Sequence, residues 1–378
     1  MAVDGRLPIN ITFQSVDTAY VLISDFVSVL SCIGCMVIII LYVAYKNLRT
    51  TSRLLLVCLS VADIFVCIST VLQTETYYES IALPQQKSYR CQISASLLVF
   101  SQICAALWTV AVTFYLFLCV TCRYVTVANR IIFLFHIFCW GMPILVATSA
   151  EISGVYGYST QDLYLYHHPT SCWISDRVAN PTQWHLLTVE GWVMAAFVSV
   201  SIMYLFITGS VMKQKGRGRV LAGDDVVQEL AIQTANEHLR FIPALYVATR
   251  LWGTAYFFFT RYQDSSHLRA SDWLMIFKAI GDNSQGLVNA IYFCTSSRQV
   301  RLVVGKKLST LCFCCSGWCK QQKLNAQDKW KGVNSIVRMR KGPKRPKQLD
   351  GSDLDLSGIS LDLPTESTGG EDEVIFER

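Results

Sequence analysis

Hydrophobic residues fill seven long stretches of the chain, and short polar segments separate them. The stretches are 21–44, 54–73, 91–120, 131–150, 185–209, 241–260 and 273–295. A helix of about 20 apolar residues is long enough to cross the roughly 30 Å of hydrocarbon in a membrane. The pattern therefore predicts an all-α fold: a bundle of seven transmembrane helices over residues 21–296, which follows a short amino-terminal tail, residues 1–20.

The composition of the chain supports a membrane protein. Of its 378 residues, 52% are hydrophobic and only 16% are charged. Soluble domains contain about 25% charged residues. The first hydrophobic stretch is longer than the apolar core of a signal peptide, so we expect it to remain in the protein as a membrane helix.

Lysine and arginine are concentrated in alternate loops, and this asymmetry sets the orientation. The basic loops carry Lys46, Arg49 and Arg53; Arg123 and Arg130; and Lys213, Lys215, Arg217, Arg219 and Arg240. Such loops lie in the cytosol, which places the amino terminus outside the cell and the carboxyl terminus inside. Asn10, in the glycosylation acceptor Asn-Ile-Thr, then lies on the outer side, where glycosylation takes place.

Two of the fifteen cysteines fall in or beside extracellular segments in this topology. Cys91 lies at the outer end of the third stretch, and Cys172 lies in the long loop 151–184. The others lie in lipid or in the reducing cytosol, where disulfides are rare. We expect a Cys91–Cys172 disulfide that holds the loop over the mouth of the bundle, with two free thiols as the alternative.

Charged and amide side chains interrupt the second, sixth and seventh stretches. Asp63 and Arg250 each lie about ten residues from the cytosolic end of a stretch, and Asp282 lies near the middle of the seventh. A charge at this depth costs about 2.5–3.5 kcal/mol on insertion scales, so such groups normally face the bundle interior and pair. We expect Arg250 to pair with Asp282. We expect Asp63 to bind Asn289 and water, and Gln285 shares a helix face with Asn289.

Two prolines fall inside hydrophobic stretches. Pro143 lies in the fourth stretch and Pro243 in the sixth. Proline has no backbone N–H and clashes with the preceding turn, so we predict a kink in both helices.

Several strings within the stretches resemble those of G-protein-coupled receptors. They are RLLLVCLSVADIF (53–65), WTVAVTFYLFL (108–118), FHIFCWGMPILV (135–146), CWI (172–174), IPALYVATRLW (242–252) and GDNSQGLVNAIYF (281–293). In this order they are similar to the orphan G-protein-coupled receptor 157 group and, more distantly, to the slime-mould cyclic-AMP receptors. The resemblance implies a receptor in the plasma membrane, with the ciliary membrane as a further location. It would bind an extracellular ligand and activate a heterotrimeric G protein through helix rearrangement.

The sequence departs from the large rhodopsin-like class of these receptors at two places. The string CRY (122–124) resembles that class's Asp/Glu-Arg-Tyr motif, but it lies about two helical turns too far from Cys91. Asn289 is followed by alanine, where that class has proline. We interpret CRY as ordinary flanking charge. The buried polar residues are either a switch or only a means of holding the helices together, and our hypothesis is that Arg250 and Asp282 form the switch.

A ligand of such a receptor is expected to enter between the outer ends of the third, fifth, sixth and seventh spans, under the tethered loop. Glu190, Trp192, Trp252 and Tyr256 are the candidate lining residues. Tryptophans near a membrane edge are also typical anchors in the lipid interface, so the two tryptophans have a second interpretation.

The segment after the seventh span predicts contacts with the inner membrane surface. Residues 297–319 combine basic with apolar residues, which is typical of an interfacial helix. Its acylation candidates are Cys312, Cys314, Cys315 and Cys319. A zinc site is the alternative, although the spacing lacks the paired cysteines that favour tetrahedral coordination.

Two further cytosolic segments bear on partners. Residues 320–378 contain few apolar residues, which predicts a disordered tail. Its serines and threonines suit phosphorylation and then arrestin binding, and its basic part suits anionic lipid rather than nucleic acid. Loop 210–240 has apolar residues at helical spacing and would extend the sixth span as a docking surface for the G protein.

Other functions of a seven-helix chain stay open. Lys278 in the seventh span could carry a retinal Schiff base, although a lysine at this depth more often extends to the membrane edge. A transporter usually contains internal repeats or paired broken helices, and the two halves of this sequence show no repeat. An enzyme is disfavoured, because the sequence has no nucleophile elbow and no metalloprotease motif. We expect no cofactor and no metal.

Overall fold

The computed structural model describes most of the hydrophobic part of the chain. Its described residues are 11–82, 89–158, 172–175, 177–215, 239–262, 272–296 and 300–301. Asn10, the loop residues 216–238 and residues 302–378, which include the four acylation cysteines and the tail, lie outside the described residues. The expectations for these segments stay predictions.

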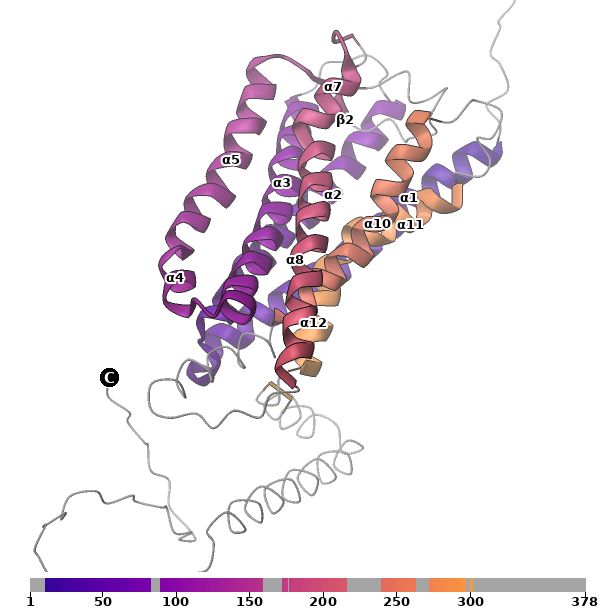
Figure 1. Ribbon diagram of the computed structural model, residues 1–378. Helices are drawn as coiled ribbons and strands as arrows, with labels where there is room; N and C mark the ends of the chain where they lie inside the picture. Colours follow the sequence, from indigo (N-terminus) through magenta and orange to yellow (C-terminus); the bar gives the residue numbers. More distant parts are fainter. Residues whose placement is uncertain are drawn as a thin grey trace, which may run out of the picture. The chain divides into compact units, whose positions relative to one another are not determined.

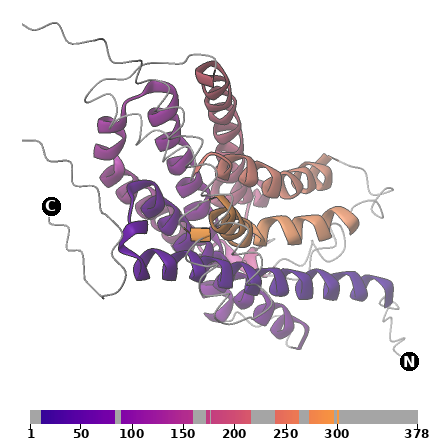
Figure 2. The same ribbon diagram turned by 90° about the horizontal axis from the view of Figure 1, so that it is seen from below.

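Long helices pack into a bundle, drawn from the side in Figure 1 and from below in Figure 2. They are α1 (Ile11–Ala44), α2 (Thr51–Ala82), α3 (Tyr89–Phe117), α5 (Ile132–Ile152), α8 (Gly191–Lys215), α10 (Ile242–Tyr262), α11 (Asp272–Asn283) and α12 (Gln285–Ser296). Shorter helices connect them: η1 (Lys46–Leu48), η2 (Leu118–Cys122), α4 (Val125–Arg130), α7 (Pro181–His185) and η3 (Leu186–Glu190). The predicted all-α bundle is confirmed.

Five helices in the described part of the chain are long and apolar enough to cross a membrane. They cover Thr18–Ala44, Thr51–Glu79, Tyr89–Cys122, Ile132–Ile152 and Pro181–Lys213. The sixth and seventh spans of the sequence correspond to α10 and to the pair α11 and α12. Polar residues are concentrated in these elements, which makes them less apolar. In addition, α11 and α12 are short, with only 12 residues each.

The seventh span is interrupted at Ser284, whereas the sequence predicted one helix over 273–295. The Ser284 hydroxyl donates to the Gly281 carbonyl at 3.2 Å, and Asn283 Nδ2 donates to the Ala279 carbonyl at 2.8 Å. Side chains that bond to the preceding turn compete with the helical backbone and favour a break. The prediction of a single helix was therefore wrong at this residue.

The two prolines occupy different positions in their helices. Pro143 lies inside α5, which continues on both sides of it. Pro243 is the second residue of α10, and a nitrogen in the first turn has no intrahelical acceptor to lose. The kinks predicted at Pro143 and Pro243 stay predictions.

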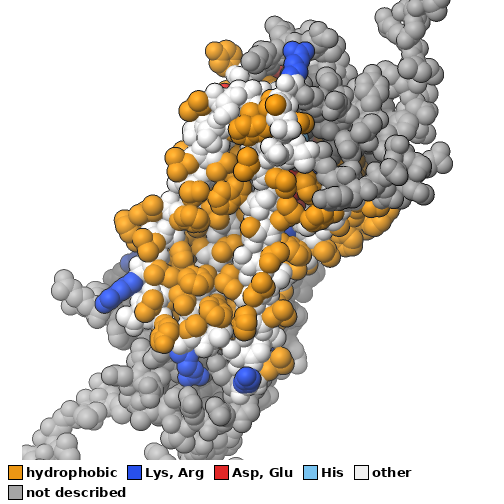
Figure 3. All heavy atoms as spheres, turned by 45° about the horizontal axis from the view of Figure 1, so that its top comes forward, with side chains coloured by type: hydrophobic (Ala, Val, Ile, Leu, Met, Phe, Trp, Pro, Cys, Tyr) orange, Lys and Arg blue, Asp and Glu red, His pale blue; other side chains and the backbone are white. Residues whose placement is uncertain are grey.

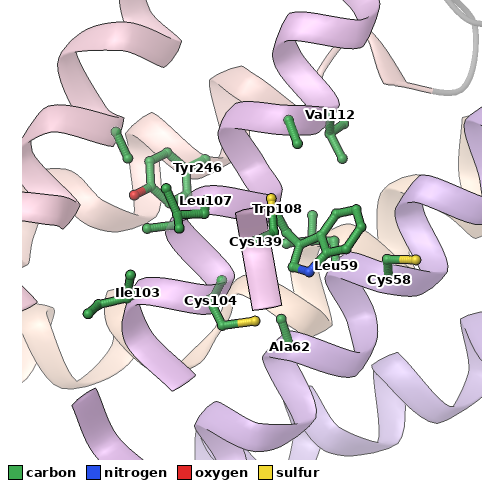
Figure 4. Packing of buried hydrophobic residues seen from close by; sticks show 14 of the residues in the cluster. Cys58, Leu59, Ala62, Ile103, Cys104, Leu107, Trp108, Val112, Cys139 and Tyr246 are labelled. Atoms are coloured by element: carbon green, nitrogen blue, oxygen red, sulfur yellow. The ribbon is translucent and has the colours of Figure 1, made fainter. Parts of the chain in front are cut away.

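The core of the bundle lies around α3, which contacts α2, α5, α8 and α10. Figure 4 shows Trp108 and Cys104 of α3 among side chains of neighbouring helices, with Cys58 from α2 and Tyr246 from α10. Trp108 and Tyr246 are among the largest fully buried side chains of the protein. The polar residues described below are therefore held by a closely packed apolar frame.

The outward faces of the helices are hydrophobic. Figure 3 shows hydrophobic side chains along most of one face of the bundle. Exposed examples are Phe26, Ile33 and Ile40 of α1 and Phe133 and Leu145 of α5. Such faces are suited to lipid. Figure 2 shows α1 alongside α11 and α12, and the contacts of α1 with both close the bundle between its first and last spans.

A short hairpin belongs to the loop that follows α5. Strands β1 (Tyr156–Tyr158) and β2 (Cys172–Ile174) pair in antiparallel register, with Tyr156 opposite Ile174. Cys172 forms a disulfide with Cys91 of α3, as predicted. Gln73 Nε2 of α2 also donates to the Cys172 carbonyl at 2.8 Å. The loop is thus fixed to both α2 and α3.

Candidate functional site

Arg250 of α10 lies inside the bundle and joins three helices. It is only 3% exposed, and its Nη1 donates to Asp282 Oδ1 of α11 at 3.3 Å and to Gln102 Oε1 of α3 at 2.9 Å. The Tyr246 ring centroid lies 5.9 Å from the guanidinium carbon. Sequence analysis proposed Asp282 as the partner but missed Gln102. A neutral amide in an apolar stretch carries no charge that would indicate a partner.

Glycines allow α10 and α11 to approach closely at this ion pair. A Cβ placed on Gly253 would lie 2.7 Å from Asp282 Oδ1 and 2.9 Å from Oδ2. A Cβ on Gly281 would collide with the Thr249 carbonyl oxygen of α10. Small residues at such positions permit close backbone contact between membrane helices, and here they place the carboxylate against α10.

A second group of polar contacts joins α12 to α2 and α3. Asn289 Nδ2 donates to Asp63 Oδ2 at 3.4 Å, and both residues are buried. Gln285 Nε2 donates to Thr109 Oγ1 of α3 at 3.0 Å. Asp63 also interacts electrostatically with Arg250. Sequence analysis proposed the contact between Asp63 and Asn289 but did not identify Thr109.

Two further hydrogen bonds hold α2 to neighbouring helices, and sequence analysis missed both. Thr70 Oγ1 donates to Asn283 Oδ1 of α11 at 2.8 Å. Thr74 Oγ1 donates to Asp25 Oδ1 of α1 at 2.8 Å. Asp25 was the clearer signal, because a carboxylate in a hydrophobic stretch needs a partner.

A mixed group of side chains lies toward the extracellular ends of the helices, and we call it the outer cluster: Tyr20, Glu190, Tyr256 and Lys278. Lys278 Nζ lies 5.4 Å from the centroid of the Tyr256 ring. Lys278 interacts electrostatically with Tyr20 and Glu190 as well as with Asp282. Tyr20 of α1 packs beside the buried Tyr256. Lys278 Nζ therefore lies against a ring of α10, and the expectation that this lysine extends to the membrane edge stays a prediction.

A π-helix positions Glu190 at the start of α8. Leu186–Glu190 form η3, whose wider turn is followed directly by Gly191. A Cβ on Gly191 would collide with the Leu186 carbonyl oxygen, so the turn requires glycine. Single π-turns inside helices are common at functional sites, because they redirect the side chains that follow.

The candidate lining residues divide into two pairs. Glu190 and Tyr256 belong to the outer cluster. Trp192 Nε1 instead donates to the Leu187 carbonyl at 2.9 Å, on the same segment. Trp252 packs beside Tyr256, and its ring stacks on Phe277 with the centroids 4.8 Å apart. The two tryptophans thus support the surrounding helices, while their role toward a ligand stays a prediction.

Six of these residues are connected through the contacts described above: Lys278, Asp282, Arg250, Gln102, Asp63 and Asn289. The pair Gln285 and Thr109 joins α12 to α3 beside them, and we call all eight residues the polar column. Its residues lie on α2, α3, α10, α11 and α12, and its outer end, Lys278, also belongs to the outer cluster. No group of three or more His, Cys, Asp or Glu side chains in the described segments is arranged to hold a metal ion.

This architecture agrees with a known receptor family. The model of the family described as 7 transmembrane receptor (Secretin family) matches residues 18–288. The chain belongs to this family. It is accordingly a multi-pass membrane receptor of the G-protein-coupled type and not an enzyme.

Individual relatives give the same result. The chain is 26% identical to G-protein coupled receptor 157 of Mus musculus over 293 residues, which are 76% of this chain and 83% of that protein. The Homo sapiens protein of that name is 26% identical over 287 residues, 75% of this chain and 81% of its own length. The crystal structure of squid rhodopsin has the same fold, with a TM-score of 0.59 at 13% identity over 92% of this chain and 91% of that chain.

Proposed function

We propose that the protein is a receptor that binds a small extracellular ligand at the outer cluster and activates a heterotrimeric G protein through its polar column. Coupling to a G protein follows from the family. The observation that carries the rest of the proposal is the position of Arg250, which holds α10 to both α11 and α3 directly below the outer cluster. A ligand that displaces α10 or α11 must therefore change these contacts.

The polar column contains groups that could exchange partners. Arg250 Nε, Gln285 Oε1 and the Tyr246 hydroxyl are buried and have no hydrogen-bond partner among the described residues. Buried polar atoms are strongly driven to find partners. An alternative helix arrangement that satisfied them would gain hydrogen bonds that the present one lacks, and a ligand that favours that arrangement would shift the receptor toward it.

The cytosolic ends of α10 and α12 provide the proposed output. Phe241, directly before α10, packs edge to face on Tyr292 of α12, with the ring centroids 5.7 Å apart. The Arg240 guanidinium carbon lies 4.9 Å from the Phe241 ring centroid. Movement of α10 would separate Phe241 from Tyr292 and expose their rings to the cytosol. We propose that the G protein binds the surface opened there.

The proposal is tested on the full-length chain in cells, with an amino-terminal tag detected on intact cells to measure the amount at the plasma membrane. Basal G-protein activation, calcium and cyclic AMP are recorded with and without a ligand panel. We expect Arg250→Gln to change basal activation severalfold at equal surface level, because it removes the ion pair with Asp282. Leu145→Ala, on the lipid-facing side of α5, is the matched control. An Arg250→Gln receptor that signals as the wild type at equal surface level would contradict the proposal.

A further inference from the structure

Lys278 of α11 carries a positive charge that lies against an aromatic ring instead of a carboxylate. Its Nζ lies 5.4 Å from the centroid of the Tyr256 ring of α10. In the described part of the chain this nitrogen forms no hydrogen bond and no ion pair. The carboxylate of Asp282, one helical turn further along α11, is paired with Arg250 instead. An ammonium group has three donors, and those of Lys278 are therefore available to a ligand.

The ammonium group of Lys278 is also accessible. The residue is half-buried, and its Nζ does not belong to the buried polar atoms without a partner among the described residues, which include Arg250 Nε. Glu190 of η3 interacts with Lys278 electrostatically, but the two form no ion pair. A charged side chain in a membrane-spanning helix that keeps accessible surface and has no paired carboxylate is a candidate for ligand binding.

The surroundings of Lys278 are apolar and aromatic. Tyr256 packs with Leu274 and Met275, and none of these three residues is more than 5% exposed. Leu274 and Met275 precede Lys278 by four and three residues, so they share its face of α11. Trp252 of α10 packs against the same group. One positive charge among apolar side chains suits a ligand with one negative charge and an apolar body.

We propose that Lys278 and the apolar side chains around it bind a monocarboxylic acid with an apolar body, aromatic or aliphatic. Its carboxylate would accept hydrogen bonds from Lys278 Nζ, and its body would lie against Tyr256 and Trp252. The inference rests on the proposed receptor function and specifies the ligand class.

Charge and burial favour this class over the other simple ones. A cation would be repelled by Lys278, and a neutral molecule would leave the ammonium group without a counter-charge. An anion with two charges, such as sulfate, would bring into apolar surroundings a second charge that Lys278 cannot match, and burying such a charge is costly. A single carboxylate matches the ammonium group and forms charge-assisted hydrogen bonds, which are about twice as strong as neutral ones.

The site adjoins the polar column at its outer end. Lys278 precedes Asp282 by four residues on α11, and Tyr256 follows Arg250 by six residues on α10. Figure 1 shows α1, α10 and α11 running close together, and both α1 and α10 contact α11. A ligand held at Lys278 would therefore contact the two helices that the ion pair of Arg250 and Asp282 joins, which connects its binding to the proposed switch.

The test measures binding and needs no signalling partner. The purified full-length receptor in lipid nanodiscs is heated with phenylacetate, indole-3-acetate, octanoate or decanoate, and each acid is compared with its primary amide. Unfolding is followed with a thiol-reactive dye, because buried cysteines such as Cys35, Cys104 and Cys139 become accessible when the bundle opens. We expect at least one acid to raise Tm by several degrees, while its amide, acetate and sulfate leave Tm unchanged.

Variants assign the effect to Lys278. Lys278→Gln is expected to abolish the Tm shift, and Lys278→Arg, which keeps the charge, should retain it. Lys213→Gln, which alters an exposed lysine of α8, is the matched control and should retain the full shift. The comparison of each acid with its amide on the wild type decides the inference even where a variant at Lys278 fails to fold.

Three results would overturn the inference: none of the four acids raises Tm, an amide raises Tm as much as its acid, or Lys278→Gln keeps the shift. These results differ from a failure of the proposed function. A receptor that an acid stabilises, but whose Arg250→Gln variant signals as the wild type, keeps the site and loses the proposed switch. A receptor whose Arg250→Gln variant changes basal activation, while no acid raises Tm, keeps the function and loses the site.

Discussion

Gln102 of α3 accepts a hydrogen bond from Arg250 of α10, and its 2.9 Å Nη1–Oε1 distance is shorter than the 3.3 Å from the same nitrogen to the Asp282 carboxylate. The buried arginine is thus held by a neutral amide on the central helix as well as by its counter-charge on α11. Because α3 contacts α2, α5, α8 and α10, this hydrogen bond connects the ion pair to the central helix of the bundle.

Replacing Gln102 tests this connection. Gln102→Leu removes the acceptor and should lower the free energy of unfolding by about 1.5–3 kcal/mol, the usual value for a hydrogen bond to a charged group. Gln102→Glu keeps an acceptor at the same place and should be less destabilised than the leucine variant. The thermal unfolding of the purified variants in lipid nanodiscs measures both effects. Equal Tm values for Gln102→Leu and the wild type would show that Arg250 does not depend on this contact.

The ion pair itself should behave as a coupled unit. Asp282→Leu removes the ion-pair partner of the buried Arg250 and leaves Gln102 as its hydrogen-bond partner and Asp63 as a more distant counter-charge. Losing one member of a buried pair costs about 3–5 kcal/mol. Arg250→Met together with Asp282→Leu removes both charges and should be less destabilising than Asp282→Leu alone. A double-mutant cycle based on denaturation yields the coupling free energy. Strictly additive effects would mean that the two charges are stabilised by other groups.

The disulfide should stabilise the bundle through the hairpin. Changing both Cys91 and Cys172 to alanine avoids a free thiol and should lower the free energy of unfolding by about 2–5 kcal/mol. Gln73→Ala removes the other contact to the Cys172 carbonyl and should cost about 0.5–1.5 kcal/mol. Thermal unfolding of the purified variants separates the two contributions. A double alanine variant with the Tm of the wild type would show that the loop is held by other contacts.

Charge and compartment made part of this structure predictable from the sequence. Arg250 and Asp282 stand out because a charge in an apolar stretch is costly without a partner, and the structure contains that ion pair. Cys91 and Cys172 stand out because the other cysteines fall in segments where disulfides do not form. In both cases the residue type and its environment together leave very few favourable partners for the side chain.

Neutral polar residues were not predictable in the same way. Gln102 and Thr109 lie in a stretch that reads as an ordinary apolar helix, because a single amide or hydroxyl changes its hydrophobicity little. The direction of Lys278 depends on the Tyr256 ring, which lies 22 residues earlier on another helix. The break at Ser284 depends on side chains that bond to the preceding turn. Each of these features is decided by tertiary or local hydrogen bonding, which hydrophobic periodicity does not report.

The close contact between α10 and α11 gives the sharpest test, because the chain offers a matched glycine. Gly253→Ala would place a Cβ 2.7 Å from Asp282 Oδ1 and must displace the carboxylate or separate the helices. Overpacking of this kind costs about 1–3 kcal/mol, so we expect a lower Tm and altered basal G-protein activation. Gly141→Ala in α5 meets no atom within 4 Å and should leave both quantities unchanged or raise Tm slightly, because alanine favours the helix. If the two variants had the same Tm and the same basal activation, the close approach of α10 to the Asp282 carboxylate would not matter for stability or signalling.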